Sequence, residues 1–262
     1  MNNVGFIGVG YMGYGIAKNI LEKGNSLFVI ANKNRKPIDK IVDLGATEVN
    51  TLEEFKEKKL NVLVKCVTNT PIAKEIATKL SNILDENTLI IDITTHNKTG
   101  SIETEKIYHS SNINYVECPV MGGPVQAEQG VLGGIVGASE ANFKLAEPYL
   151  KLFCKNYFHF GPVGMGAKSK LLNNFLTLGN AALINHMAKA AKQFDLDLQK
   201  LFDVAKLGSG NSAALIRVFD ALLQGDSTGF KFTASNSVKD LTYIQDLLKD
   251  FPEAEKIAED NK

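Results

Sequence analysis

A glycine-rich loop near the N-terminus constrains the fold of this chain more than any other feature. The apolar run at residues 4–7 leads directly into Gly8-Val9-Gly10-Tyr11-Met12-Gly13, and a helical pattern follows. In such a strand–turn–helix unit the first glycine permits the tight turn, the second lets a ligand approach the backbone, and the third lets the helix pack on the strand. The helix N-terminus then offers unpaired N–H groups to phosphates. The loop therefore predicts dinucleotide binding, with all six residues of the motif at the cofactor.

Short apolar runs alternate with helical patterns as far as about residue 160. The runs lie at residues 4–7, 27–31, 61–67, 88–93, 114–117 and 132–136. Strands that alternate with helices in this way form a mostly parallel sheet covered on both faces. We therefore expect an α/β domain of the doubly wound Rossmann type over residues 1–162.

The pattern changes at a cluster of helix breakers, residues 161–166. Beyond it no run favours a strand, whereas residues 167–194 contain no proline and predict one long helix, followed by helical patterns at 196–207, 213–223 and 237–248. Residues 163–262 are therefore expected to form an all-α domain for substrate binding and oligomerisation. Because the long helix is apolar almost all round, we expect it to pack against more than one neighbour, in a homodimer or homotetramer.

Composition excludes several classes of function. The 262 residues carry 29 basic and 29 acidic side chains, so no net charge favours nucleic acid or an anionic membrane as a partner. Three widely spaced cysteines argue against a disulfide framework and a Cys-rich metal site, and we expect no metal. Cys66 and Cys118 are expected to be buried structural thiols. With no apolar run near the ~20 residues of a membrane span and no signal peptide, we expect a cytoplasmic protein.

The end of the second predicted strand indicates which dinucleotide binds. An NAD-specific site usually places Asp or Glu there, on the ribose 2′-hydroxyl. Residues 30–37 contain no acid and three cations, one of which is an arginine. A guanidinium can bind a 2′-phosphate with two hydrogen bonds. We therefore predict NADP, with NAD as the alternative, and place Asn32, Lys33 and Arg35 at the phosphate; the competing interpretation is a solvated turn.

One face of the long helix is polar near its start. Lys170, Asn173, Asn174 and Thr177 have the spacing i, i+3, i+4, i+7, which places them on one side. A buried lysine is costly unless it is paired or used, and burial lowers its pKa toward values suited to proton transfer near neutrality. The alternative is a helix start that is simply solvated.

Five segments give the chain an ordered likeness to a known family. They are Gly8–Gly13, Asp92-Ile93-Thr94-Thr95, Pro119-Val120-Met121-Gly122-Gly123, the run from Gly164 to Asn174, and Lys239-Asp240-Leu241. In these the chain resembles the β-hydroxyacid dehydrogenase family, which includes 3-hydroxyisobutyrate dehydrogenases, tartronate semialdehyde reductases, glyoxylate/succinic semialdehyde reductases and, more distantly, 6-phosphogluconate dehydrogenase. The resemblance implies NADP-dependent hydride transfer between nicotinamide and a small β-hydroxy acid or its semialdehyde or 2-oxo acid counterpart.

The resemblance also implies roles for individual residues. Lys170 would be the catalytic acid/base and Asn174 would orient the substrate. The remaining cofactor contacts would come from Val67, Thr68, Asn69, Thr95 and Lys239. The substrate would lie against Met121, Gly122, Gly123, Asn173, Phe230 and Asp240, with its carboxylate on the backbone of the two glycines.

The chain departs from the family pattern in ways that keep alternatives open. Met121 stands where the family usually has a serine, which leaves the substrate in doubt. Imine reductases share the architecture, although they usually carry Asp or Tyr at the position of Lys170. A catalytically silent NADP-binding module is the third interpretation, favoured by the altered substrate loop and by a chain that ends soon after the Lys-Asp-Leu motif. We expect His96 to be a surface residue and assign no role to Arg217.

Overall fold

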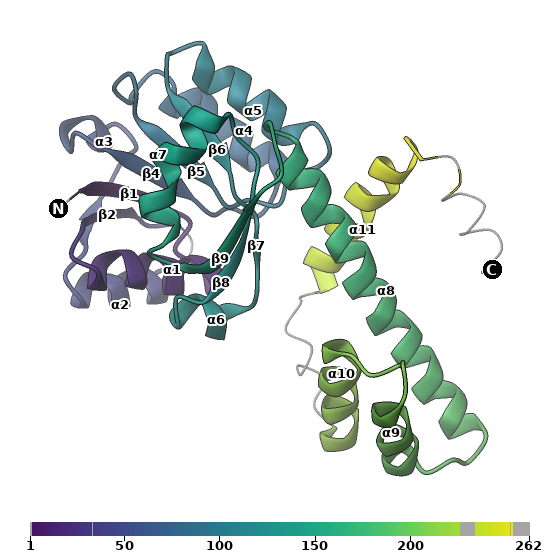
Figure 1. Cartoon of the computed structure of the whole chain (residues 1–262). Coiled ribbons are helices and arrows are strands. Elements are labelled where there is room, and N and C mark those ends of the chain that lie inside the picture. The colour runs from purple at the N-terminus through teal and green to yellow at the C-terminus, as the bar shows by residue number, and fades with distance from the viewer. Residues whose placement is uncertain (1, 33, 226–233, 252, 254–262) are drawn as a thin grey trace. The chain divides into compact units, whose positions relative to one another are not determined.

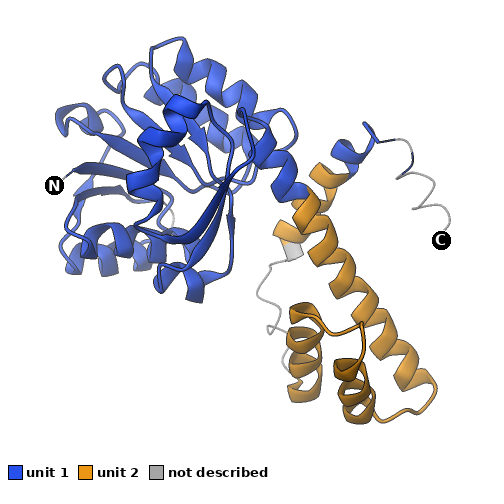
Figure 2. Cartoon of the chain, viewed as in Figure 1, with its two compact units in different colours: residues 1–171, 245–262 blue, residues 172–244 orange. Residues whose placement is uncertain are grey.

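The structure is a computed structural model that describes residues 2–32, 34–225, 234–251 and 253 (Figure 1). It divides into two compact units, coloured separately in Figure 2: residues 1–171 with 245–262, and residues 172–244. The boundary between them falls inside one long helix, α8 (Met165–Gln193).

The first unit is built on a six-stranded parallel sheet. Its elements are β1 (Asn3–Ile7), α1 (Tyr11–Glu22), β2 (Ser26–Ile30), α2 (Lys36–Asp43), β3 (Thr47–Val49), α3 (Glu54–Glu57), β4 (Val62–Lys65), α4 (Thr70–Leu80), β5 (Leu89–Asp92), α5 (Gly100–His109) and β6 (Asn114–Glu117). The strand order is β3-β2-β1-β4-β5-β6, and every pair is parallel. The order reverses between β1 and β4, and in such sheets ligands bind at the carboxyl ends of the strands beside that point. The predicted doubly wound fold is confirmed.

Both faces of this sheet are buried. Along β4, Val62 and Val64 face a core covered by α1, α2 and the later helix α7 (Glu140–Leu150), whereas Leu63 faces the core under α4 and α5. Strands covered on both sides read as continuous apolar runs rather than alternating ones. This explains why the five main strands were recognisable from the sequence.

A second, three-stranded sheet completes the first unit. It contains β7 (Val120–Met121), β8 (Leu132–Val136) and β9 (Cys154–His159), in the order β7-β8-β9, with α6 (Pro124–Glu128) and α7 between them in sequence. The run at 132–136 is a strand, but its expected place in the parallel sheet was wrong: β8 pairs antiparallel with β7 and parallel with β9. Strands as short as β3 and β7 cannot show an alternation of apolar and polar residues, so the sequence did not indicate them. The sequence did not indicate β9 either, because β9 is mostly polar and exposed.

The described residues of the second unit form helices joined by short loops, with no strand among them. Besides the larger part of α8 it contains α9 (Leu198–Leu207), α10 (Ala213–Gln224) and most of α11 (Ala234–Leu248). Its core joins Ile184 of α8 to Phe202 and Phe219, whose rings stack with centroids 5.0 Å apart. In the described part of the chain no helix is long and apolar enough to cross a membrane.

Candidate active site

The glycine loop has the geometry of a phosphate cradle. Gly8 has φ +98°, and a side chain there would collide with the carbonyl oxygen of Cys66. A side chain on Gly13 would collide with the carbonyl of Gly8, because α1 packs closely against the end of β1. A Cβ on Gly10, by contrast, would meet no described atom within 4 Å. Within the described residues no side chain caps the first turn of α1, and no acidic residue lies in that turn. The N–H groups at the start of α1 therefore face the open space beside Gly10, where a pyrophosphate could accept hydrogen bonds from them.

Two acidic side chains surround the guanidinium of Arg35, which precedes α2. Arg35 Nη1 lies 3.0 Å from Glu48 Oε1, and Nη2 lies 2.9 Å from Glu48 Oε2 and 3.1 Å from Asp39 Oδ1. The hydrogen bonds from Arg35 hold the pKa of Glu48 below its usual value. Residues 30–37 contain no acid, but β2–β3 pairing brings Glu48 alongside β2, and no local pattern could have shown that. Asn32 is exposed, and Lys33 lies outside the described residues.

The loops that follow β4 and β5 are tied to each other. The N–H of Val67 donates to Thr94 Oγ1 at 3.3 Å, and the N–H of Asn97 donates to Thr70 Oγ1 at 3.1 Å. Asn69 caps α4, since its Oδ1 accepts from the N–H of Ile72 at 3.0 Å. The structure thus brings together the two loops that carry the expected contacts Val67, Thr68, Asn69 and Thr95.

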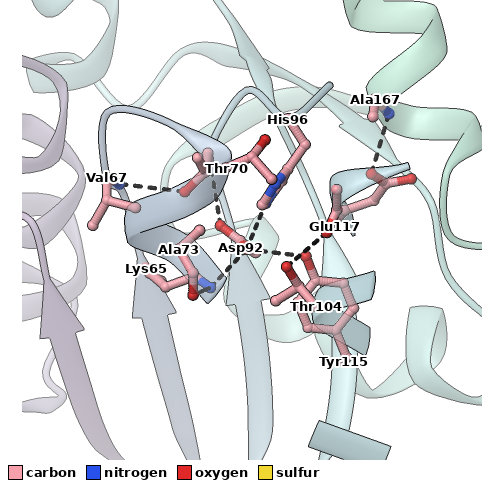
Figure 3. A network of polar contacts seen from close by, with 12 residues as sticks. Lys65, Val67, Thr70, Ala73, Asp92, His96, Thr104, Tyr115, Glu117 and Ala167 are labelled. Atoms are coloured by element: carbon pink, nitrogen blue, oxygen red, sulfur yellow. Dashed lines mark hydrogen bonds and ion pairs between the residues drawn. The ribbon is translucent and has the colours of Figure 1, made fainter. Parts of the chain in front are cut away.

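A buried ion cluster lies beneath these loops (Figure 3). Oδ2 of Asp92 is 2.9 Å from Lys65 Nζ, 2.9 Å from His96 Nε2 and 3.0 Å from the hydroxyl of Tyr115, while Oδ1 accepts from the N–H of Thr94 at 3.0 Å. All these side chains are almost completely buried. Burial alone would raise the pKa of Asp92, but Lys65 and His96 hold it well below its usual range. The expectation that His96 is a surface residue was therefore wrong, because this cluster encloses its ring.

Sequence reasoning also missed Lys65, although the sequence contains a signal for it. Lysine is rarely buried without a partner, and Lys65 stands inside an otherwise apolar strand. Its ammonium also donates to the carbonyl of Ala73 at 3.1 Å, which ties the cluster to α4.

Glu117, at the end of β6, anchors the start of α8. Its Oε1 accepts from the N–H groups of Gly164 at 2.6 Å and Gly166 at 2.9 Å, and its Oε2 accepts from Ala167 at 3.2 Å (Figure 3). Burial raises the pKa of Glu117 despite these donors. A buried carboxylate at a helix N-terminus satisfies N–H groups that would otherwise have no partner. It fixes the first turn of the helix on which Lys170 stands.

Lys170 meets the substrate loop expected from the sequence. Its side chain is 8% exposed, and Nζ donates to the carbonyl of Val120 at 2.8 Å and lies 3.3 Å from Met121 Sδ. The alternative of a simply solvated lysine was wrong. The expected donor on Gly123 needs a correction as well: its N–H already binds Gln126 Oε1 at 2.9 Å, as part of the cap of α6. Gly122, at φ +116°, adjoins it.

The expected residues of the second unit form a group of their own. Asn174 Nδ2 donates to Asp240 Oδ2 at 2.7 Å, with both side chains buried, and Lys239 Nζ lies 3.1 Å from Asp240 Oδ1. Asn173 is exposed. Phe230 lies outside the described residues.

The cysteines form no disulfides, and of the two that were expected to be buried, Cys118 is buried whereas Cys66 is only partly buried. Cys66, Cys118 and Cys154 are free thiols, and Cys118 and Cys154 are buried. A hydrogen bond with Cys154, together with burial, raises the pKa of Cys118 well above its usual value, which makes it unreactive. Among the described residues no three His, Cys, Asp or Glu side chains gather as a metal site.

Comparison with known proteins finds two family models that match this chain. Residues 3–161 match the family model of the NAD-binding domain of 6-phosphogluconate dehydrogenase. Residues 164–254 match that of the NAD-binding domain of NADP-dependent 3-hydroxyisobutyrate dehydrogenase.

Individual proteins show the same likeness. The chain is 26% identical over 230 residues to 2-(hydroxymethyl)glutarate dehydrogenase of Eubacterium barkeri, covering 86% of this chain and 76% of that one. It is 31% identical over 210 residues to a probable mitochondrial 3-hydroxyisobutyrate dehydrogenase of Dictyostelium discoideum, covering 79% and 64%. A solved 3-hydroxyisobutyrate dehydrogenase from Salmonella typhimurium superposes with a TM-score of 0.85 at 24% identity, over 96% and 88% of the chains.

The two family models together span almost the entire chain. The chain therefore belongs to the β-hydroxyacid dehydrogenase family of NAD(P)-dependent oxidoreductases, which act on CH–OH and C=O groups.

Proposed function

We propose that the protein is an NADP-dependent enzyme that interconverts a small β-hydroxy acid and its semialdehyde or 2-oxo acid counterpart. The observation that carries the proposal is the position of Lys170. Its nearly buried ammonium lies against the Val120–Met121 loop, within the unit that also holds the glycine cradle. Cofactor binding alone gives no reason for an ammonium at this loop, whereas protonation of a substrate oxygen would use one.

Lys170 acts as the acid and base. In the reducing direction its ammonium protonates the oxygen of the carbonyl group as negative charge develops on it, and in the oxidising direction the neutral amine accepts that proton. A nicotinamide bound beside it would supply or accept the hydride. The N–H of Gly122 is the backbone donor that we assign to the substrate carboxylate, with Asn174, Asn173, Asp240 and Phe230 as further substrate residues.

The cofactor residues follow the parts of a dinucleotide. The N-terminus of α1 and residues 8–13 hold the pyrophosphate, Arg35 with Asn32 and Lys33 holds the 2′-phosphate, and the loops after β4 and β5 hold the nicotinamide half. Lys239 is assigned to the cofactor by family resemblance. We place the enzyme in the cytoplasm, where its free thiols would stay reduced, and as a homodimer or homotetramer.

Met121 defines the substrate class more narrowly. A thioether next to Lys170 replaces a hydroxyl that could bind a carboxylate, so the side of the pocket at residue 121 is apolar. We therefore expect substrates with a less polar group at this point than the usual small semialdehydes.

A substrate panel tests this function. Glyoxylate, succinic semialdehyde, tartronate semialdehyde, methylmalonate semialdehyde and a cyclic imine are each offered with NADPH or NADH, and the loss of cofactor absorbance is followed. We expect turnover with at least one of the carbonyl compounds and a preference for NADPH. Turnover of a cyclic imine alone would indicate an imine reductase. Tight NADPH binding without any turnover would indicate a silent module, and equal or better use of NADH would contradict the NADP assignment.

A further inference from the structure

We propose that Glu48 determines how strongly the protein prefers NADPH to NADH, because it competes with the 2′-phosphate for Arg35. The inference rests on the proposed role of Arg35 in NADP binding. Glu48 lies on β3, outside both the glycine loop and the end of β2.

The hydrogen bonds that Arg35 makes with Glu48 and Asp39 leave few of its N–H donors for a phosphate. A guanidinium has five N–H donors, two on each Nη and one on Nε. Glu48 takes one donor from each Nη, and Asp39 takes another from Nη2. The two that remain, on Nη1 and Nε, point to different sides of the group. A phosphate can be bound by two parallel hydrogen bonds only if it displaces a carboxylate.

The local charge acts in the same direction. Two carboxylates around one guanidinium leave the group of Arg35, Asp39 and Glu48 with a net charge of −1. A 2′-phosphate brings about −1.5 to −2 charges, so it is repelled by both acids, whereas the 2′-hydroxyl of NADH is neutral. The pairing therefore weakens NADPH binding and leaves NADH binding nearly unchanged.

Glu48 is the stronger of the two competitors. It makes two hydrogen bonds to Arg35, and the register Val29↔Glu48 fixes its backbone beside β2. Its side chain is 25% exposed, compared with 55% for Asp39, which makes a single contact from the first turn of α2. Exposed ion pairs are weak, so a phosphate can displace Glu48. The result is a reduced preference for NADPH and not a closed site.

Calorimetric titration of the intact protein tests the proposal without relying on activity. Adenosine 2′,5′-bisphosphate reports on the 2′-phosphate, 5′-AMP is its matched control, and NADPH and NADH are titrated in parallel. For Glu48→Gln we expect affinity for the bisphosphate and for NADPH to rise about two- to fivefold, the equivalent of one exposed ion pair, with no change for 5′-AMP and NADH. Asp39→Asn should have a smaller effect, and Glu75→Gln, a charge change on α4, should have none.

The Arg35→Met background separates this inference from the function on which it rests. Arg35→Met should weaken NADPH relative to NADH, and in that background Glu48→Gln should no longer have an effect. If Arg35→Met leaves the preference unchanged, the proposed NADP site itself is wrong. If Arg35→Met lowers the preference for NADPH, the NADP site stands. The role of Glu48 is then refuted if Glu48→Gln leaves NADPH affinity unchanged or lowers it. It is also refuted if Glu48→Gln raises NADPH affinity by the same factor in the Arg35→Met background.

Discussion

At the scale of single residues, Lys170 and Met121 define the chemistry of the site between them. The ammonium of Lys170 donates a hydrogen bond to the carbonyl of Val120, and the thioether sulfur of Met121 also contacts this ammonium. The backbone carbonyl holds the ammonium against the loop that carries Met121.

Replacing Lys170 with methionine tests its assigned role. We expect kcat to fall by about 10²–10⁴, the usual contribution of a positioned acid or base. The Kd for NADPH should stay within about twofold, because Lys170 is assigned to the substrate side. Lys168→Met is the matched control: it stands two positions earlier on α8, about 200° around the helix, and should leave kcat nearly unchanged. Loss of NADPH binding in Lys170→Met would show that the lysine is a cofactor residue instead.

At the scale of elements, buried charges hold the loops and helices that form the site. Asp92 reaches Lys65 on its neighbouring strand, His96 in its own loop and Tyr115 on β6, while Glu117 holds the start of α8. Each carboxylate stands at the carboxyl end of a parallel strand. The lysine inside an apolar strand is visible in the sequence, but its pairing with Asp92 and that of Asp92 with Tyr115 are not, because these partners come together only when the strands pair.

Lys65→Met should destabilise the first unit strongly. Breaking one side of a buried ion pair leaves an uncompensated charge, which costs about 3–5 kcal/mol of unfolding free energy at neutral pH. Lys59→Met is the control, since Lys59 is 72% exposed in its ion pair with Asp85 and should change stability by less than about 0.5 kcal/mol. Urea unfolding measures both.

The pH dependence of this loss has a definite sign. In the wild type the pKa of Asp92 is depressed, so its stabilising contribution is present above the unfolded pKa of about 3.9 and is lost as the pH falls below it. In Lys65→Met burial acts on Asp92 without that cation and raises its pKa, and a proton taken up by the Asp92 carboxylate restores the charge balance. The difference between variant and wild type should therefore shrink from about pH 7 to about pH 4. The same loss at both pH values would contradict this account of the cluster.

At the scale of the whole molecule, α8 presents apolar side chains that are exposed in the part of the chain that the structure describes. Leu172, Leu176 and Leu183 are 51%, 64% and 71% exposed, and their spacing places them within about 40° of one another around the helix. Exposed apolar patches of this kind mark interfaces. The observation supports the proposed homo-oligomer.

Charged residues on this stripe should dissociate the oligomer. We expect sedimentation velocity to give the wild type a mass that is a multiple of 28.5 kDa. Leu176→Glu with Leu183→Glu should shift it toward the monomer, because an interface would bury the new charges. Leu145→Glu, on the exposed side of α7, is the control and should not change the mass. A monomeric wild type would refute the oligomer outright.

The sequence by itself determined the features that depend on neighbours along the chain. These are the glycine loop, the five continuous apolar strands, the long helix and the face that carries Lys170, because turn geometry and helical spacing are local properties. The tertiary structure alone decided which charges meet. Strand pairing set Glu48 against Arg35 and Asp92 against Lys65, and it placed β8 in a second sheet. Ion pairs and strand register depend on distances in space between segments that are far apart in the sequence. A local pattern could therefore identify Arg35 as a cation, but it could not reveal that Arg35 is paired with Glu48.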